Sequence, residues 1–188
     1  MKIIGITGSL SSGKSTVAKF IVEKKNYPLF SADKEVSKLY RNKLFITKLQ
    51  RSFNIKKKKN IKKIIKLKIK IKKNLIKLEK LIHPLVRMKM NVFIEKNRNK
   101  NIIVLEIPLL IESKLGNYFD LIIFVGAPKN LRIRRFLQKG GNIEFFKILD
   151  TRQIRKKKKS KFCDHQIVNN KSKRLLKIKV SNILRKYE

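Results

Sequence analysis

Gly8-Ser9-Leu10-Ser11-Ser12-Gly13-Lys14-Ser15 decides the fold of this chain, because it matches the pattern G-x-x-x-x-G-K-[ST] in full. The apolar stretch from Lys2 to Thr7 precedes it as an expected strand, and Lys14 to about Lys25 follows as an expected helix. The glycines let the backbone fold closely around a phosphate, so that its N–H groups and the helix N-terminus bind the anion. The alternative is an accidental Gly/Ser turn, against which the strand–loop–helix setting argues.

Residues of this loop have distinct expected roles. The Lys14 ammonium would reach the β- and γ-phosphates of ATP, the Ser15 hydroxyl would ligate Mg²⁺, and Thr16 would lie close to the α-phosphate. The residues expected to bind ATP in this loop are Gly8, Ser11, Ser12, Gly13, Lys14, Ser15 and Thr16. The motif also occurs in GTPases, helicases and transporter ATPases. A chain of 188 residues is small for a motor core, and the guanine-reading pattern N-K-x-D is absent, which leaves mainly small-molecule kinases.

Expected strands alternate with expected helices along the rest of the chain, as in an α/β fold with a parallel sheet. The strands cover residues 27–30, 101–107, 120–125 and 165–168, and the helices cover residues 84–96, 130–139, 143–158 and 172–187, with another through Val36, Leu39 and Tyr40. Pro84 is expected at the first position of its helix. Residues 54–82 are a Lys/Ile segment with both strand-like and helix-like periodicity, for which we favour a helix.

Composition limits the function classes. The formal net charge of +38 would suit a nucleic-acid surface, but the excess is Lys accompanied by Ile and Asn, which share A/T-rich codons. We therefore attribute it to genome composition at solvated positions and expect no specific nucleic-acid partner. No signal peptide or membrane-spanning run is visible, so we expect a soluble cytoplasmic protein without a membrane partner, monomeric by default. One cysteine excludes an internal disulfide framework.

Several blocks of the chain resemble the dephospho-coenzyme A kinase family. They are Ile4 to Gly8 with Ser12 to Thr16, Ser31-Ala32-Asp33, His83-Pro84-Leu85-Val86-Arg87, Pro108-Leu109-Leu110-Ile111-Glu112, Arg135, Gln153, and Cys163 to Asn170. The resemblance implies transfer of the ATP γ-phosphate to the 3′-hydroxyl of dephospho-CoA, with Mg²⁺ as cofactor. It also implies a P-loop NTPase three-layer fold with a mostly parallel five-stranded sheet, a helical substrate-binding subdomain and a lid. The alternative is another small-molecule or nucleoside kinase of the same fold.

Two acids are candidates for the chemistry. Asp33 ends the second expected strand, where a carboxylate could accept the proton of the attacking hydroxyl. The resemblance gives Asp33 this catalytic, substrate-binding role, whereas an N-cap aspartate is the alternative. Glu106 lies late in an apolar strand, where burial of a carboxylate is costly unless it is paired. We expect Glu106 beside the Mg²⁺, although the family usually has Asp there.

The resemblance places His83 and Arg87 beside the acceptor substrate, where two cations suit a pyrophosphate; capping or packing is the alternative for His83. Glu112 is expected near the same substrate, with a structural role as its alternative. Arg135 and Lys139 lie four residues apart on one helical face, ahead of Gly140-Gly141, and would carry cations over the phosphoryl group from a mobile lid. Arg135 is expected to be catalytic and Lys139 to bind ATP.

Some positions depart from the family pattern. Ser31 replaces the first Asp of Asp-Ala-Asp, and Lys139 stands where the family has Arg, whose bidentate geometry a lysine does not reproduce. A family arginine upstream of His83 has no clear match, although Lys62 or Lys63 could substitute. We expect one kinase domain over residues 1–188, with a core of about 1–53 and 101–188, a helical substrate-binding insertion at 54–100 and a lid at about 136–158.

Overall fold

The computed structural model describes residues 1–56, 60–154 and 156–187. Residues 57–59 of the expected 54–82 helix, and residue 155 of the expected lid, therefore lie outside the described residues. The chain divides into two compact units. One unit comprises Met1–Ser31 and Ile94–Glu188, and the other comprises Ala32–Phe93.

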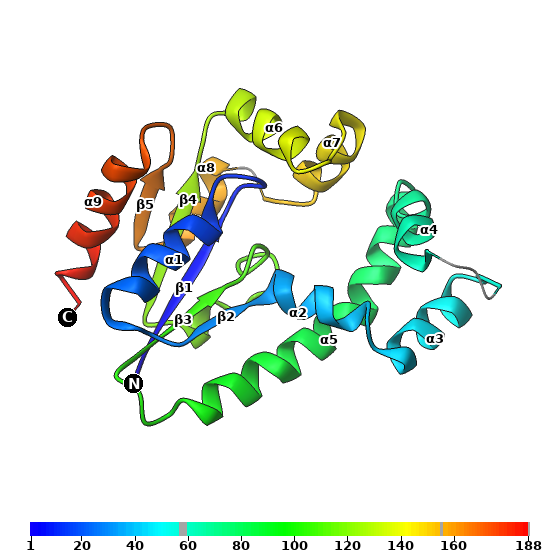
Figure 1. The fold of residues 1–188 in the computed structure, drawn as a ribbon, viewed down its shortest axis with the longest axis horizontal. Coiled ribbons are helices and arrows are strands. Elements are labelled where there is room, and N and C mark those ends of the chain that lie inside the picture. The colour runs from blue at the N-terminus through cyan, green and yellow to red at the C-terminus, as the bar shows by residue number, and fades with distance from the viewer. Residues whose placement is uncertain (57–59, 155, 188) are drawn as a thin grey trace. The chain divides into compact units, whose positions relative to one another are not determined.

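The first unit is built on a parallel sheet. Its strands are β1 (Lys2–Gly8), β2 (Leu29–Ser31), β3 (Ile102–Glu106), β4 (Leu121–Gly126) and β5 (His165–Val168). They form a five-stranded sheet in the order β2-β3-β1-β4-β5, and every pairing is parallel (Figure 1). The near-continuous apolar runs of β3 and β4 are buried along their whole length, as strands covered on both faces require. The expected α/β P-loop fold is confirmed.

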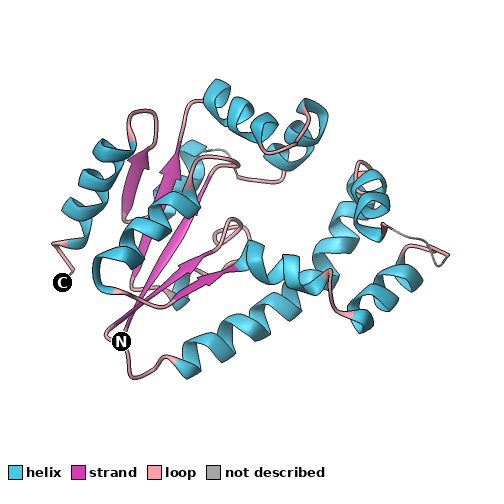
Figure 2. Ribbon diagram, viewed as in Figure 1, coloured by secondary structure: helices cyan, strands magenta, loops and turns pink. Residues whose placement is uncertain are grey.

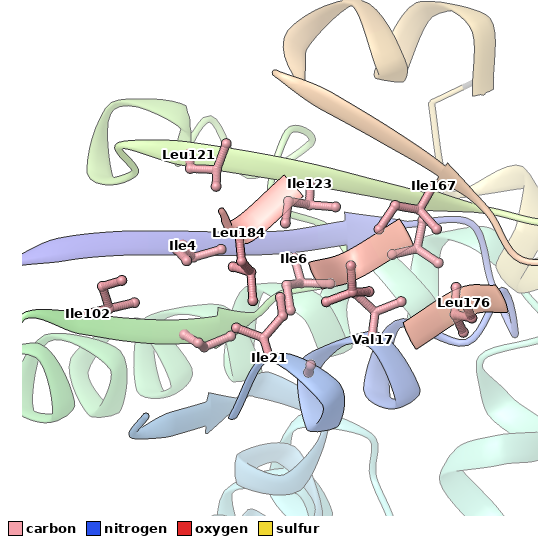
Figure 3. Packing of buried hydrophobic residues seen from close by; sticks show 14 residues of the cluster. Ile4, Ile6, Val17, Ile21, Ile102, Leu121, Ile123, Ile167, Leu176 and Leu184 are labelled. Carbon is pink, nitrogen blue, oxygen red and sulfur yellow. The ribbon is translucent and has the colours of Figure 1, made fainter. Parts of the chain in front are cut away.

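One face of the sheet packs against helices α1 (Lys14–Lys25) and α9 (Lys173–Leu184). Alternate residues of each strand point to this face, because side chains in a strand alternate between its two sides. The cluster comprises Ile4, Ile6, Val17, Ala18, Ile21, Ile102, Val104, Leu121, Ile123, Val125, Ile167, Leu176, Val180 and Leu184 (Figure 3). This packing fixes the start of α1 at the end of β1, where the phosphate loop lies.

The remaining short helices of the first unit lie in the connections from β3 to β4 and from β4 to β5. They are η1 (Gly116–Tyr118), α6 (Lys129–Gln138), α7 (Ile143–Thr151), α8 (Lys156–Lys159) and η2 (Ser160–Phe162). The single helix expected over 143–158 is wrong, because α7 ends at Thr151. The Ile154 N–H donates to Glu112 Oε1 at 3.0 Å, so a distant carboxylate replaces the partner that a continuing helix would supply.

The second unit is helical (Figure 2). Its helices are α2 (Ala32–Leu39), α3 (Lys43–Ser52), α4 (Ile61–Lys68) and most of α5 (Lys72–Lys96). Pro84 lies inside α5 rather than at a helix start, which corrects the expected position. A proline in a helix interior costs about 3 kcal/mol, and burial of Leu78, Ile82 and Met90 along the same helix offsets this cost.

The expected 54–82 helix is also interrupted. Helix α4 ends at Lys68, and the Asn74 side chain donates to the Lys68 carbonyl at 2.9 Å, which satisfies a group left open at the helix end. Helix α3 has no counterpart among the expected elements. Its signals are the N-cap Asn42, whose side chain accepts from the Phe45 N–H, and the buried pair Phe45 and Leu49, four residues apart.

Candidate functional site

The loop between β1 and α1 has a backbone that only glycine fits at two positions. Gly8 has φ 151° and Gly13 has φ 97°. A Cβ on Gly8 would overlap the Val125 carbonyl oxygen, and one on Gly13 would overlap the Asn169 side chain. Ser11 also adopts the left-handed region, at φ 55°. The loop therefore has the close curvature that phosphate binding requires, with the first N–H groups of α1 at its end.

Lys14 is buried in this loop, with 7% of its surface exposed. Its ammonium donates to the Ser9 carbonyl at 2.9 Å and to the Gly8 carbonyl at 3.4 Å. The Lys14 ammonium is thus held against the backbone of its own loop. Thr16 is half-buried in the first turn of α1, and its N–H donates to the Gly13 carbonyl at 3.1 Å.

Glu106, the last residue of β3, joins the loop to the neighbouring strand. Its Oε1 accepts from the Ser15 hydroxyl at 2.6 Å, and its Oε2 accepts from the Ser31 hydroxyl at 3.1 Å. Only 4% of the Glu106 surface is exposed. Two hydroxyl donors compensate for the loss of water around this carboxylate. From the sequence alone, Ser31 at the end of β2 is recognisable only as a departure from the family pattern.

Ser15 and Glu106 fit a magnesium–nucleotide site. Mg²⁺ takes few protein ligands and keeps waters and substrate phosphates as the others. The Ser15 hydroxyl donates its hydrogen bond to Glu106 Oε1, which leaves the lone pairs of the serine oxygen available to a cation, and the carboxylate lies beside it. Within the described part of the chain, no three His, Cys, Asp or Glu side chains gather into an all-protein metal cage. The donor set therefore suits Mg²⁺ bound together with a phosphate.

Arg135 of α6 contacts the phosphate loop at Ser12. Its guanidinium donates to the Ser12 carbonyl at 3.4 Å and to the Asn169 carbonyl at 3.2 Å. The Asn169 side chain also donates to the Ser12 carbonyl, at 2.8 Å. Ser12 itself is fully buried, and its carbonyl accepts from both Arg135 and Asn169. Lys139 caps the C-terminus of α6 and is exposed.

In the second unit, Asp33 lies in the first turn of α2, one residue after the helix begins at Ala32. It is exposed, and its carbonyl accepts from the Ser37 hydroxyl at 2.9 Å. Because Asp33 is inside the helix, it does not occupy the N-cap position that the alternative interpretation needs. His83 and Arg87 are both exposed and lie one turn apart on one face of α5. The structure brings these two cationic candidates together.

Glu112 takes part in a buried ion pair. Both of its carboxylate oxygens accept from the Lys159 ammonium at 2.9 Å, and only 1% of Lys159 is exposed. Lys159 also donates to the Pro108 carbonyl at 2.7 Å. Burial lowers the pKa of Lys159, and the nearby Glu112 opposes that shift. This geometry favours the structural alternative for Glu112, whose substrate-binding role stays a prediction.

The chain is similar to known proteins in both sequence and fold. A family model described as dephospho-CoA kinase matches residues 2–174. A dephospho-CoA kinase from Bartonella quintana is 36% identical over 177 residues, which cover 91% of this chain and 90% of that protein. The solved dephospho-CoA kinase from Campylobacter jejuni is 27% identical, with a TM-score of 0.69 over 100% of this chain and 98% of its own. A shikimate kinase from Acinetobacter baumannii is 13% identical, with a TM-score of 0.59 over 100% of this chain and 95% of its own, a likeness of fold alone.

Proposed function

The chain belongs to the dephospho-CoA kinase family, and we propose that its loop from Gly8 to Thr16 holds the MgATP that phosphorylates dephospho-CoA. Family membership makes it an ATP-dependent kinase that phosphorylates a hydroxyl, here the 3′-hydroxyl, in the last step of coenzyme A synthesis. The observation that carries the site assignment is the 2.6 Å hydrogen bond from Ser15 to Glu106. It joins the phosphate loop to a buried carboxylate, as a magnesium–nucleotide site needs.

On the donor side, Lys14 exchanges its partners when ATP binds. Its ammonium leaves the Ser9 and Gly8 carbonyls for the β- and γ-phosphates, which carry full negative charge and form stronger hydrogen bonds. Mg²⁺, held by Ser15 and Glu106, would neutralise charge on the phosphate oxygens. Arg135 supplies a further cation from α6 in the transition state, and Lys139 a weaker one.

On the acceptor side, Asp33 takes the proton of the 3′-hydroxyl. The new bond joins that oxygen to the γ-phosphorus, the bond from the γ-phosphorus to the bridging oxygen breaks, and ADP leaves with its electrons. His83 and Arg87 bind the pyrophosphate of dephospho-CoA, because two adjacent cations on one helical face suit two adjacent phosphates. The exposed side chain of Asp33 and its place inside α2 support the role of base over that of helix cap.

The test is a coupled assay of ADP formation with dephospho-CoA for the wild type, Lys14→Ala and Asp33→Asn. We expect kcat/KM to fall by roughly 10²–10³ for Lys14→Ala and by roughly 10²–10⁴ for Asp33→Asn. The matched control is Lys19→Ala, which removes an exposed lysine from the same helix and should retain wild-type activity. Thermal unfolding followed by circular dichroism should be similar for all four proteins. Full activity of Asp33→Asn would refute its assignment as the base.

A further inference from the structure

Leu10, in the phosphate loop, is held at both of its backbone groups by side chains from distant parts of the first unit. Its N–H donates to Gln153 Oε1 at 2.9 Å. Its carbonyl accepts from the Arg132 guanidinium at 3.4 Å. Gln153 and Arg132 lie 143 and 122 residues away along the chain. These contacts therefore fix the loop from outside its own strand–loop–helix segment.

Asp150 of α7 contacts both of these residues, at the side chain of Arg132 and at the backbone of Gln153. Its carboxylate binds the Arg132 guanidinium in a bidentate pair, with distances of 2.6 and 3.4 Å. Its carbonyl accepts from the Gln153 N–H at 3.2 Å. Arg132 is only 9% exposed, and its guanidinium lies 5.5 Å from the centre of the Phe146 ring. Such a bidentate pair, with side chains only 11% and 25% exposed, holds its geometry better than a fully exposed one.

The loop needs this support because of the residue that follows Leu10. Ser11 adopts φ 55°, a left-handed conformation that costs roughly 1–2 kcal/mol for a residue with a Cβ. Such strain persists only where surrounding contacts over-determine the backbone. Leu10 directly precedes Ser11, so contacts to both of its backbone groups limit the torsion angles that the strained residue can reach.

We propose that Gln153 and Arg132 are positioning residues that hold Leu10 and thereby set the affinity of the phosphate loop for ATP. The inference rests on the proposed kinase function of the same loop. Neither side chain needs to touch the nucleotide, because each acts through the loop backbone. Without them, the loop samples other conformations and must be ordered again at every binding event, which weakens ATP binding before any chemistry occurs.

The first experiment compares Gln153→Met with Gln138→Met. Methionine has about the length of glutamine but lacks the carbonyl acceptor, and Gln138 is an exposed residue at the end of α6. We expect Gln153→Met to raise the KM for ATP about tenfold, the equivalent of one lost hydrogen bond to a loop that is otherwise intact. The kcat and the KM for dephospho-CoA should stay within about twofold. Gln138→Met should match the wild type. A lower kcat with an unchanged KM for ATP would indicate loss of folded enzyme and would overturn the proposal.

A second measurement does not depend on kinase activity. Hydrogen exchange, read for the Leu10 amide, should quicken about tenfold in Gln153→Met but not in Gln153→Glu, which keeps an acceptor oxygen. Unchanged exchange of Leu10 in Gln153→Met would refute the proposed contact, even if the KM rose. If exchange and the direct affinity for ATP both respond but no dephospho-CoA is phosphorylated, the proposed function fails and the positioning role stands.

Discussion

Glu106 carries a carboxylate into a place that water barely reaches, with both oxygens occupied by serine hydroxyls. An apolar strand that ends in an acidic residue can be recognised in the sequence, and this pattern predicts a role for Glu106 near Mg²⁺. The sequence does not show which residues form hydrogen bonds with Glu106. Ser15 and Ser31 lie 91 and 75 residues away, and only the parallel pairing of β3 with β1 and β2 brings the strand ends together. Sequence spacing does not show such a contact.

At this scale we predict that Glu106→Gln separates function from stability. The variant keeps the shape of the side chain but loses the charge, so the Mg²⁺ concentration for half-maximal activity should rise roughly 10–100-fold. The apparent Tm should hold or rise, because a buried charge is removed. Glu95→Gln is the control, since Glu95 pairs only at the surface, with Arg98. Mg²⁺ dependence equal to that of the wild type would exclude Glu106 from the metal site.

Among the elements, the strands and α1 followed directly from the sequence, because buried parallel strands are continuous apolar runs and the loop motif fixes where α1 begins. The bounds of the helices in the second unit were harder to predict. In the Lys/Ile segment isoleucine and leucine recur so often that apolar periodicity does not show where a helix ends. No glycine or proline marks the end of α4 at Lys68. Pro84 indicated a helix start that does not exist, because tertiary packing stabilises α5 on both sides of this proline. Tertiary contacts thus overrode local signals in both places.

The buried ion pair between Glu112 and Lys159 joins α8 to the segment after β3. Glu112→Gln leaves the Lys159 charge buried without its carboxylate partner, so the free energy of unfolding should fall by about 3–5 kcal/mol. Burial already lowers the pKa of Lys159, and loss of Glu112 lowers it further, because Glu112 raises it. Between the lowered pKa of the folded state and the ordinary lysine pKa of 10.5, the folded state then binds fewer protons than the unfolded state, so stability rises with pH in that window.

Denaturant unfolding of Glu112→Gln at several pH values checks this prediction, with Glu95→Gln as the control. The loss of stability should shrink as the pH approaches 10.5 from below. The KM for dephospho-CoA should match that of the wild type where the variant is folded. A raised KM at undiminished stability would instead support a substrate-binding role for Glu112.

For the whole molecule, the charge of +38 is the feature least explained by the site. In the described part of the chain, the buried lysines are Lys14 and Lys159, and both meet oxygen acceptors. The other lysines whose side chains the structure describes are at least partly exposed, and such surface charge favours the approach of polyanions at low salt. The attribution of the charge to genome composition stays a prediction. No helix in the described residues has the length and apolarity to cross a bilayer.

Function at this scale was predictable because the blocks that resemble the family run along nearly the whole chain. The division at Ala32 and Phe93 was not, since no linker composition marks it. The second compact unit starts earlier than the insertion expected from residue 54, and it contains Asp33, His83 and Arg87. That the three acceptor-side residues share one unit supports their proposed roles on dephospho-CoA.

The most direct test of the central claim is acceptor specificity. The full chain is incubated with MgATP and, separately, dephospho-CoA, shikimate, deoxyadenosine or buffer, and products are identified by mass spectrometry. We predict one added phosphate on dephospho-CoA, at a rate at least about 100-fold above that of any other acceptor. Phosphorylation of deoxyadenosine or shikimate at a comparable rate, or ATP turnover that needs no acceptor, would contradict the account.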